Sequence, residues 1–280
     1  MPRYLVAQSE LPDERAKRRA RAGKSAGETY RATLRQLRPD ADVRIASPSD
    51  DGAPTFSVED IAYFDAVFLT GSPMHAYEQT SEVERQLDFM RTVFMSGVPG
   101  FGSCAGLQVA VAAAGGKVRK MPRRMEAGIA RRITATSAGR RHPLLAGRPA
   151  SWDAPAVHGD EVEELPSGAT LLASNGVTHV QAAEVRCGNG VFWGVQYHPE
   201  LAIAEIATAL RAQRDDLVAE GLAEHEEQVL ARADELDALH HHPDSPALHW
   251  RIGIDRHFAE ERLRRLEITN FLEHAVSLRG

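Results

Sequence analysis

Cys104 is the residue of this chain whose neighbours best fit a nucleophile. The segment Val98-Pro-Gly-Phe-Gly-Ser-Cys-Ala-Gly-Leu-Gln108 predicts a buried strand followed by a helix, with Gly102 and Gly106 two residues to either side of the cysteine. Glycines at such a turn let neighbouring elements approach closely and leave the apex residue exposed and strained. The helix directs the positive end of its dipole at the thiol, and the amide of Ala105 can donate to an oxyanion. The competing interpretation is a small buried cysteine.

His198 is the expected base for this thiol, because it stands where an apolar run ends. The next residue, Pro199, excludes the α conformation at His198 and keeps it extended. In extended chain, residues two apart face the same side at a separation of roughly 6–7 Å. Glu200 can therefore bond one imidazole nitrogen and leave the other for Cys104, as the third group of a nucleophilic triad does.

Apolar runs and helical patterns alternate over the first 115 residues, which predicts a doubly wound, mostly parallel sheet flanked by helices. The expected strands are Tyr4–Ala7, Val43–Ile45, Ala66–Thr70, Val98–Gly102, Thr170–Ala173 and Val191–Tyr197, and the expected helices are Ala26–Leu37, Ser81–Met95 and Ala105–Ala114. Ser81 and Glu84 fit a capping box at the start of the second helix. Segments between about Ile129 and Tyr197 are mostly strand-like.

From Leu201 onward, Ala, Leu, Glu and Arg recur at helical spacing. This pattern predicts two or three helices, with a break around His240–Pro246 and a last helix over Phe258–Leu278. We expect residues 1–205 to form one α/β domain and residues 206–280 a helical extension packed on it, with a homodimer interface as a minor alternative. His240–His242 are interpreted as a polar turn rather than a metal site, because no cysteine or carboxylate pattern accompanies them. The sequence predicts no metal and no cofactor.

The composition argues against several function classes. The net charge of −6 and pI of about 6.1 leave no basic field for nucleic acid or an anionic membrane, and Arg15–Arg21 is interpreted as a solvated helix or loop. No apolar run reaches the roughly 18 residues of a spanning helix. Only two cysteines occur, Cys104 and Cys187, in unrelated contexts. They argue against a disulfide framework and predict a reducing compartment, the cytoplasm.

Three blocks of the sequence resemble a known family. They are Gly102-Ser-Cys104-Ala-Gly106-Leu-Gln108, Val157-His-Gly-Asp160 and Gly194-Val-Gln-Tyr-His198-Pro-Glu200. In this order they resemble the signature blocks of class I glutamine amidotransferases, over about Tyr4 to Leu210. The likeness is closest to stand-alone members similar to the glutaminase domain of guanosine monophosphate synthetase. It implies a flavodoxin-like sheet and glutamine as substrate.

The resemblance also implies roles for individual residues. Cys104 would attack the side-chain amide of glutamine to give a γ-glutamyl thioester and ammonia. His198 would protonate the ammonia and then activate water, while Glu200 holds His198. The oxyanion hole falls on Gly71 or Ser72 together with Ala105. The positions implied to bind glutamine are Gln108 and the turn Val157, His158, Gly159 and Asp160.

Several alternatives stay open at this level. No ammonia-accepting domain is visible, so ammonia would go to a separate synthase or a small acceptor. The same triad would serve a γ-glutamyl hydrolase or peptidase with water as acceptor. A non-catalytic regulatory subunit is a third hypothesis. Intracellular thiol peptidases fit less well, because their histidine usually follows soon after the cysteine and here the next is His142.

Overall fold

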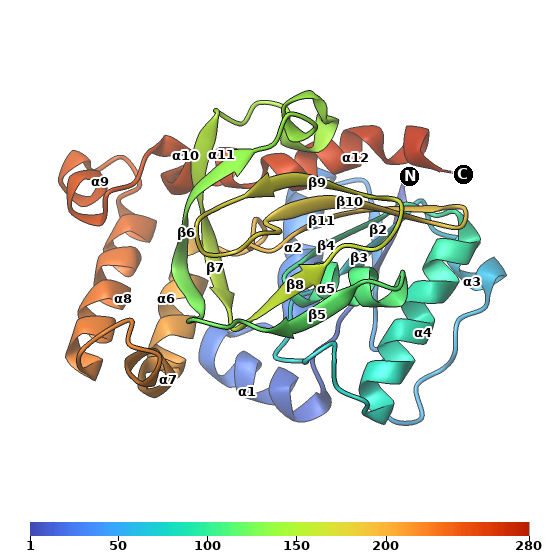
Figure 1. The fold of residues 1–280 in the computed structure, drawn as a ribbon, viewed down its shortest axis with the longest axis horizontal. Coiled ribbons are helices and arrows are strands. Elements are labelled where there is room, and N and C mark those ends of the chain that lie inside the picture. The colour runs from blue at the N-terminus through green and yellow to red at the C-terminus, as the bar shows by residue number, and fades with distance from the viewer. Residues whose placement is uncertain (280) are drawn as a thin grey trace.

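The computed structural model describes residues 1–279, and within them a mixed sheet of nine strands forms the centre of the molecule, in the order β2-β1-β3-β4-β11-β10-β9-β6-β7 (Figure 1). The strands of this sheet are β1 Arg3–Ala7, β2 Asp42–Ala46, β3 Ala66–Leu69, β4 Gly100–Ser103, β6 Glu126–Ala135, β7 Ser151–His158, β9 Ala169–Ser174, β10 Ala182–Cys187 and β11 Gly190–Val195. β5 Lys117–Lys120 and β8 Asp160–Glu164 form a separate antiparallel pair. The pairs from β2 to β11 are parallel, and those from β11 to β7 are antiparallel.

Helices cover both faces of the parallel part. They are α1 Pro12–Ala22, α2 Ala26–Leu37, α3 Val58–Ala62, α4 Ser81–Ser96, α5 Ala105–Ala113, α6 Ile203–Ala212, α7 Arg214–Ala219, α8 Glu226–His241, α9 Pro246–Ile252, α10 Arg256–Ala259, α11 Glu261–Arg264 and α12 Leu266–Leu278. The apolar side chains of α2 and α12 pack on one face, and those of α3, α4 and α5 on the other. Because both faces are covered, β3 is buried at every position, as its uninterrupted apolar sequence predicts.

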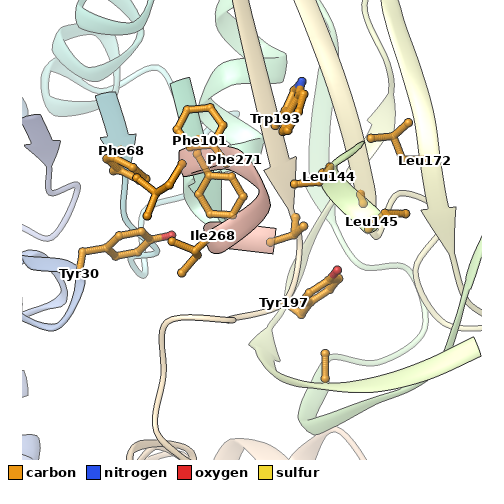
Figure 2. Close-up of a cluster of buried hydrophobic side chains, with 14 of the residues drawn as sticks. Tyr30, Phe68, Phe101, Leu144, Leu145, Leu172, Trp193, Tyr197, Ile268 and Phe271 are labelled. Atoms are coloured by element: carbon orange, nitrogen blue, oxygen red, sulfur yellow. The ribbon is translucent and has the colours of Figure 1, made fainter. Parts of the chain in front are cut away.

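The C-terminal helix α12 is part of the main core. Phe271 of α12 lies edge-on to Phe68 of β3, with ring centroids 5.4 Å apart, and 5.5 Å from the ring of Phe101 on β4. Figure 2 shows Phe271 and Ile268 of α12 facing these strands. Helices α6, α8 and α9 instead share a separate apolar cluster that also covers β6. The division into residues 1–205 and 206–280 stays a prediction.

Three expectations about local structure were wrong. Thr80, not Ser81, is the N-cap of α4, and the Ser81 hydroxyl donates to Glu82, so the capping box with Glu84 does not form. The last predicted helix is broken into α10, α11 and α12, because Glu260 is extended (φ −80°, ψ 122°). Seven helices follow residue 201 within the described chain, rather than two or three. The break after α8 is confirmed, since α8 ends at His241 and α9 begins at Pro246.

The basic segment Arg15–Arg21 also differs from expectation. It belongs to helix α1, and its Arg15 is buried rather than solvated, in an ion pair with Asp50 at 2.6 Å. No helix within residues 1–279 has the length and apolar character needed to cross a membrane.

Candidate active site

Cys104 stands at the junction of β4 and α5, as the glycine pattern predicts. Its backbone has φ 53° and ψ −113°, a conformation that costs a non-glycine residue about 1–3 kcal/mol. The turn is held because Cys104 N donates to the carbonyl of Val195 at 2.8 Å. A Cβ on Gly102 or Gly106 would lie 2.9 or 2.5 Å from the carbonyl oxygen of Leu69. The two glycines therefore allow the turn to approach β3, and the rest of the fold maintains the strain at Cys104.

His198 and Glu200 form a buried pair just beyond the end of β11. His198 Nδ1 and Glu200 Oε1 are 2.7 Å apart, and His198 N donates to the carbonyl of Pro155 at 2.8 Å. Burial alone would lower the pKa of His198. The charge of Glu200 and hydrogen bonds to Cys104 and Glu200 outweigh burial and raise this pKa to about 10. His198 is thus an imidazolium at neutral pH, and a cationic imidazole next to a thiol stabilises the thiolate.

A chain of hydroxyl groups positions Glu200 from the side opposite His198. Ser103 Oγ donates to Glu200 Oε1 at 3.0 Å. Because this bond uses the only hydroxyl hydrogen of Ser103, the Tyr30 hydroxyl donates to Ser103 Oγ, at 2.6 Å. Thr33 Oγ1 donates to the main-chain carbonyl of Glu200 at 3.3 Å. Burial raises the pKa of Tyr30 well above its ordinary value, so its hydroxyl keeps its proton.

Gly71 lies against both members of the Cys104–His198 pair. A Cβ at Gly71 would be 2.7 Å from His198 Cε1 and 3.5 Å from Cys104 Cβ, so only glycine fits. Ser72 follows, and its hydroxyl accepts from Met74 N at 3.1 Å. Ala105 is the first residue of α5, where main-chain amides have no partner inside the helix. The structure thus brings the loop after β3 and the start of α5 to the same side of Cys104.

The predicted glutamine-binding turn joins β7 to β8 and is tied to the neighbouring elements. Gln108 Nε2 donates to the carbonyl of Asp160 at 3.1 Å and to Gln196 Oε1 at 3.2 Å. The Asp160 carboxylate is 2.6 Å from His75 Nδ1, in the loop after β3. His158 is buried, and its Nδ1 lies 2.9 Å from the carbonyl of Asp160. The turn is thus fixed from three directions before any substrate arrives.

Beneath this turn lies a polar cluster around Glu126 on β6. Its carboxylate is 3.2 Å from His158 Nε2 and accepts from Asn175 at 2.7 Å and from Gln181 at 2.6 Å. Burial alone would raise the pKa of Glu126, but the bonds from His158, Asn175 and Gln181 lower it below its ordinary value. The cluster fixes the His158 ring. No sequence pattern indicated these partners, which come from four separate segments.

One cavity of about 700 Å³ contains the predicted site residues. Ten of the eleven line it: Gly71, Ser72, Cys104, Gln108, Val157, His158, Gly159, Asp160, His198 and Glu200. Ala105 lies directly behind Cys104. The remaining wall comes from α1, α6 and α7, which the sequence did not connect with the site. Within residues 1–279 no three or more metal-ligand side chains gather, and His240–His242 lie at the end of α8, outside the cavity.

Comparisons with known proteins agree on the family. The family model "Glutamine amidotransferase class-I" matches residues 23–213. A γ-glutamyl-L-1-hydroxyisopropylamide hydrolase from Pseudomonas sp is 34% identical over 282 residues, covering 98% of this chain and 93% of that protein. A glutamine-hydrolysing GMP synthase component from Sulfolobus acidocaldarius, itself one subunit of that enzyme, is 34% identical over 152 residues, covering 54% of this chain and 76% of that protein.

Solved structures show the same fold. A glutamine amidotransferase from Thermotoga maritima superposes with a TM-score of 0.66 at 18% identity, covering 98% of both chains. One from Methylobacillus flagellatus gives a TM-score of 0.57 at 17% identity, covering 96% of this chain and 94% of that one. The predicted fold class, a mostly parallel sheet flanked by helices with further helices at the C-terminus, is confirmed. The family model and the full-length Pseudomonas relative show that this chain belongs to the class I glutamine amidotransferases and is an amidohydrolase of that family.

Proposed function

We propose that the protein hydrolyses the side-chain amide of glutamine through a γ-glutamyl thioester on Cys104, with His198 as acid and base and Glu200 as its orienting partner. One observation carries the proposal: a strained, helix-capping Cys104 and the buried His198–Glu200 pair, 2.7 Å apart, both meet at Gly71. A nucleophile, an oriented imidazole and a close-fitting glycine turn are the parts that acyl transfer requires.

The reaction proceeds in two balanced halves. In the first, Cys104 Sγ bonds to the amide carbon, and the carbonyl oxygen takes up negative charge next to the amides of Ala105 and of Gly71 or Ser72. The His198 imidazolium gives its proton to the nitrogen, the C–N bond breaks, and ammonia leaves. In the second half, His198 takes a proton from water, the resulting hydroxide attacks the thioester, and the C–S bond breaks to release glutamate.

Substrate positioning falls to the groups opposite His198. We propose that Gln108 and the turn of Val157, His158, Gly159 and Asp160 hold the amino-acid end of glutamine. Their mutual hydrogen bonds support this, because a fixed turn loses little entropy on binding.

The fate of the ammonia is a separate part of the proposal. The Sulfolobus relative is named as one component of GMP synthase, which supports transfer of ammonia to a partner synthase. A homodimer and a cytoplasmic location remain predictions of the sequence.

A second candidate is hydrolysis of a γ-glutamyl amide with water as the only acceptor. The Pseudomonas relative, named for such a reaction, matches 98% of this chain, helices after β11 included, whereas the Sulfolobus relative matches 54%. The chemistry at Cys104 is the same in both candidates, and only the leaving amine differs.

Ammonia and glutamate release from glutamine by the wild-type protein and by Cys104→Ala tests the proposal. The same assay on a panel of γ-glutamyl amides separates the two candidates. Added hydroxylamine should intercept the thioester as γ-glutamyl hydroxamate in the wild type alone. A protein that binds glutamine yet resists a glutamine-like diazo-ketone label at Cys104 would instead be a regulatory subunit.

A further inference from the structure

The cavity continues well beyond the Cys104–His198 pair. Its floor, at Cys104 and His198, is 7% and 8% exposed. Its outer part runs between α1 on one side and α6 and α7 on the other, and ends at exposed residues that include Ala212 and Asp216. Figure 1 shows α1, α6 and α7 grouped beside the ends of β6 and β7. Cavities of roughly 300–1,000 Å³ hold drug-sized ligands, which are much larger than glutamine.

The position of His198 decides which end of the substrate faces this outer part. An acid that protonates the leaving nitrogen must lie on the leaving-group side of the reacting carbon. From His198 the chain runs through Glu200 and Leu201 directly into α6. Gln108 and Asp160, which face the acyl side in the proposed function, lie on the other side of Cys104. A group attached to the leaving nitrogen therefore extends toward α6.

The two walls of the outer part differ in character. On α6, Thr208, Ala209 and Ala212 line the cavity at helical spacing, so the surface there is small and mostly apolar. On α1, Arg18 lines it and is held by Glu205 of α6, with Arg18 Nη2 3.4 Å from the carboxylate. A smooth wall faces a polar one.

Charged groups surround the opening. Lys17 and Arg21 of α1, Lys120 of β5 and Asp216 of α7 all line the cavity. Lys120 pairs with Glu220 at 3.7 Å. The Lys17 ammonium and the Asp216 carboxylate make no ion pair within residues 1–279, so both are available to a polar group that reaches the opening.

From this arrangement we infer that the space between α1, α6 and α7 is a subsite for the leaving amine, and that the preferred substrate is a γ-glutamyl amide of a short aliphatic amine with a hydrogen-bonding terminal group. The inference rests on the proposed hydrolysis at Cys104. Ala209 and Ala212 set the width of the subsite: the aliphatic part of the amine lies along α6, and its terminal group reaches the charged opening.

Filling the subsite tests the inference. The measurement is kcat/KM for glutamate release from glutamine, γ-glutamyl-n-propylamide and γ-glutamyl-3-hydroxypropylamide. The wild type should prefer the hydroxypropylamide to glutamine. Ala209→Trp should lower kcat/KM for both larger amides by about tenfold or more, the effect of losing a fitted apolar contact, and leave glutamine nearly unchanged. Ala212→Leu, nearer the opening, should have a weaker effect of the same kind.

Ala231→Trp is the matched control, because Ala231 is exposed on α8 and does not line the cavity. It should change none of the three values. The inference is wrong if the wild type prefers glutamine, or if Ala209→Trp and Ala212→Leu reduce glutamine and the amides equally. Those results would leave Cys104 hydrolysis standing, whereas failure of the wild type to cleave any of the three compounds would overturn the proposed function itself.

Discussion

Replacing Glu200 with glutamine should move the alkaline limit of activity down by several pH units. Glu200 lies 2.7 Å from His198 Nδ1, and its negative charge is the main influence that raises the pKa of His198 to about 10 against the lowering effect of burial. Glutamine keeps the size and a hydrogen-bonding oxygen but removes the charge. Burial then dominates, and the pKa of His198 should return to its ordinary value of 6.5 or below.

The size of the effect follows from titration. At pH 8 a group with a pKa of about 10 is about 99% protonated, and one with a pKa of 6.5 is about 3% protonated. If the imidazolium is the acid for the leaving nitrogen, kcat/KM at pH 8 should fall about 30-fold from this cause alone. The raised pKa also stabilises the fold, fully below pH 6.5 and progressively less as pH rises toward about 10, and this pH dependence should disappear in the variant.

The assay is glutamate release between pH 5 and about 10.5, with unfolding by urea measured at the same pH values. Ser103→Ala should shift the alkaline limit in the same direction but less, because it removes one donor to Glu200 and leaves the charge. Glu227→Gln, at an exposed position of α8, is the control and should leave the profile unchanged. An alkaline limit that stays near pH 10 in Glu200→Gln would refute the role assigned to Glu200.

Three further predictions concern strain, fit and burial. Cys104→Gly should be more stable than Cys104→Ala by about 1–3 kcal/mol in urea unfolding, because glycine accepts φ 53°, and equal stabilities would argue against strain at the turn. Gly71→Ala should lower kcat/KM about tenfold or more with little change in Tm, because its Cβ would stand 2.7 Å from His198 Cε1 and displace the acid by a fraction of an ångström; an active variant would show that the loop can move away. Arg148→Met should destabilise the fold by about 3–5 kcal/mol, because it leaves the carboxylate of Glu267, which is 0% exposed, without its cation, and a loss under about 1 kcal/mol would mean that Glu267 takes up a proton.

The catalytic centre could be predicted because its determinants are local. Glycines at fixed offsets determine the turn around Cys104, and Pro199 with the two-residue repeat of extended chain places His198 and Glu200 on one side. The alternation of buried strands with helices likewise predicted the parallel half of the sheet. Such short-range rules act through backbone geometry, which does not depend on the rest of the molecule.

The sequence by itself therefore determined the nucleophile turn, the acid–base pair and the class of fold. Only the tertiary structure showed that Tyr30 supports Glu200 through Ser103, that Glu126 fixes His158, and that α1, α6 and α7 enclose the outer cavity. These contacts join segments separated by tens to more than a hundred residues, and their side chains have ordinary helix or strand patterns along the chain. Side-chain contacts of this range exist only once the sheet and its helices have packed, so no local pattern of residues encodes them.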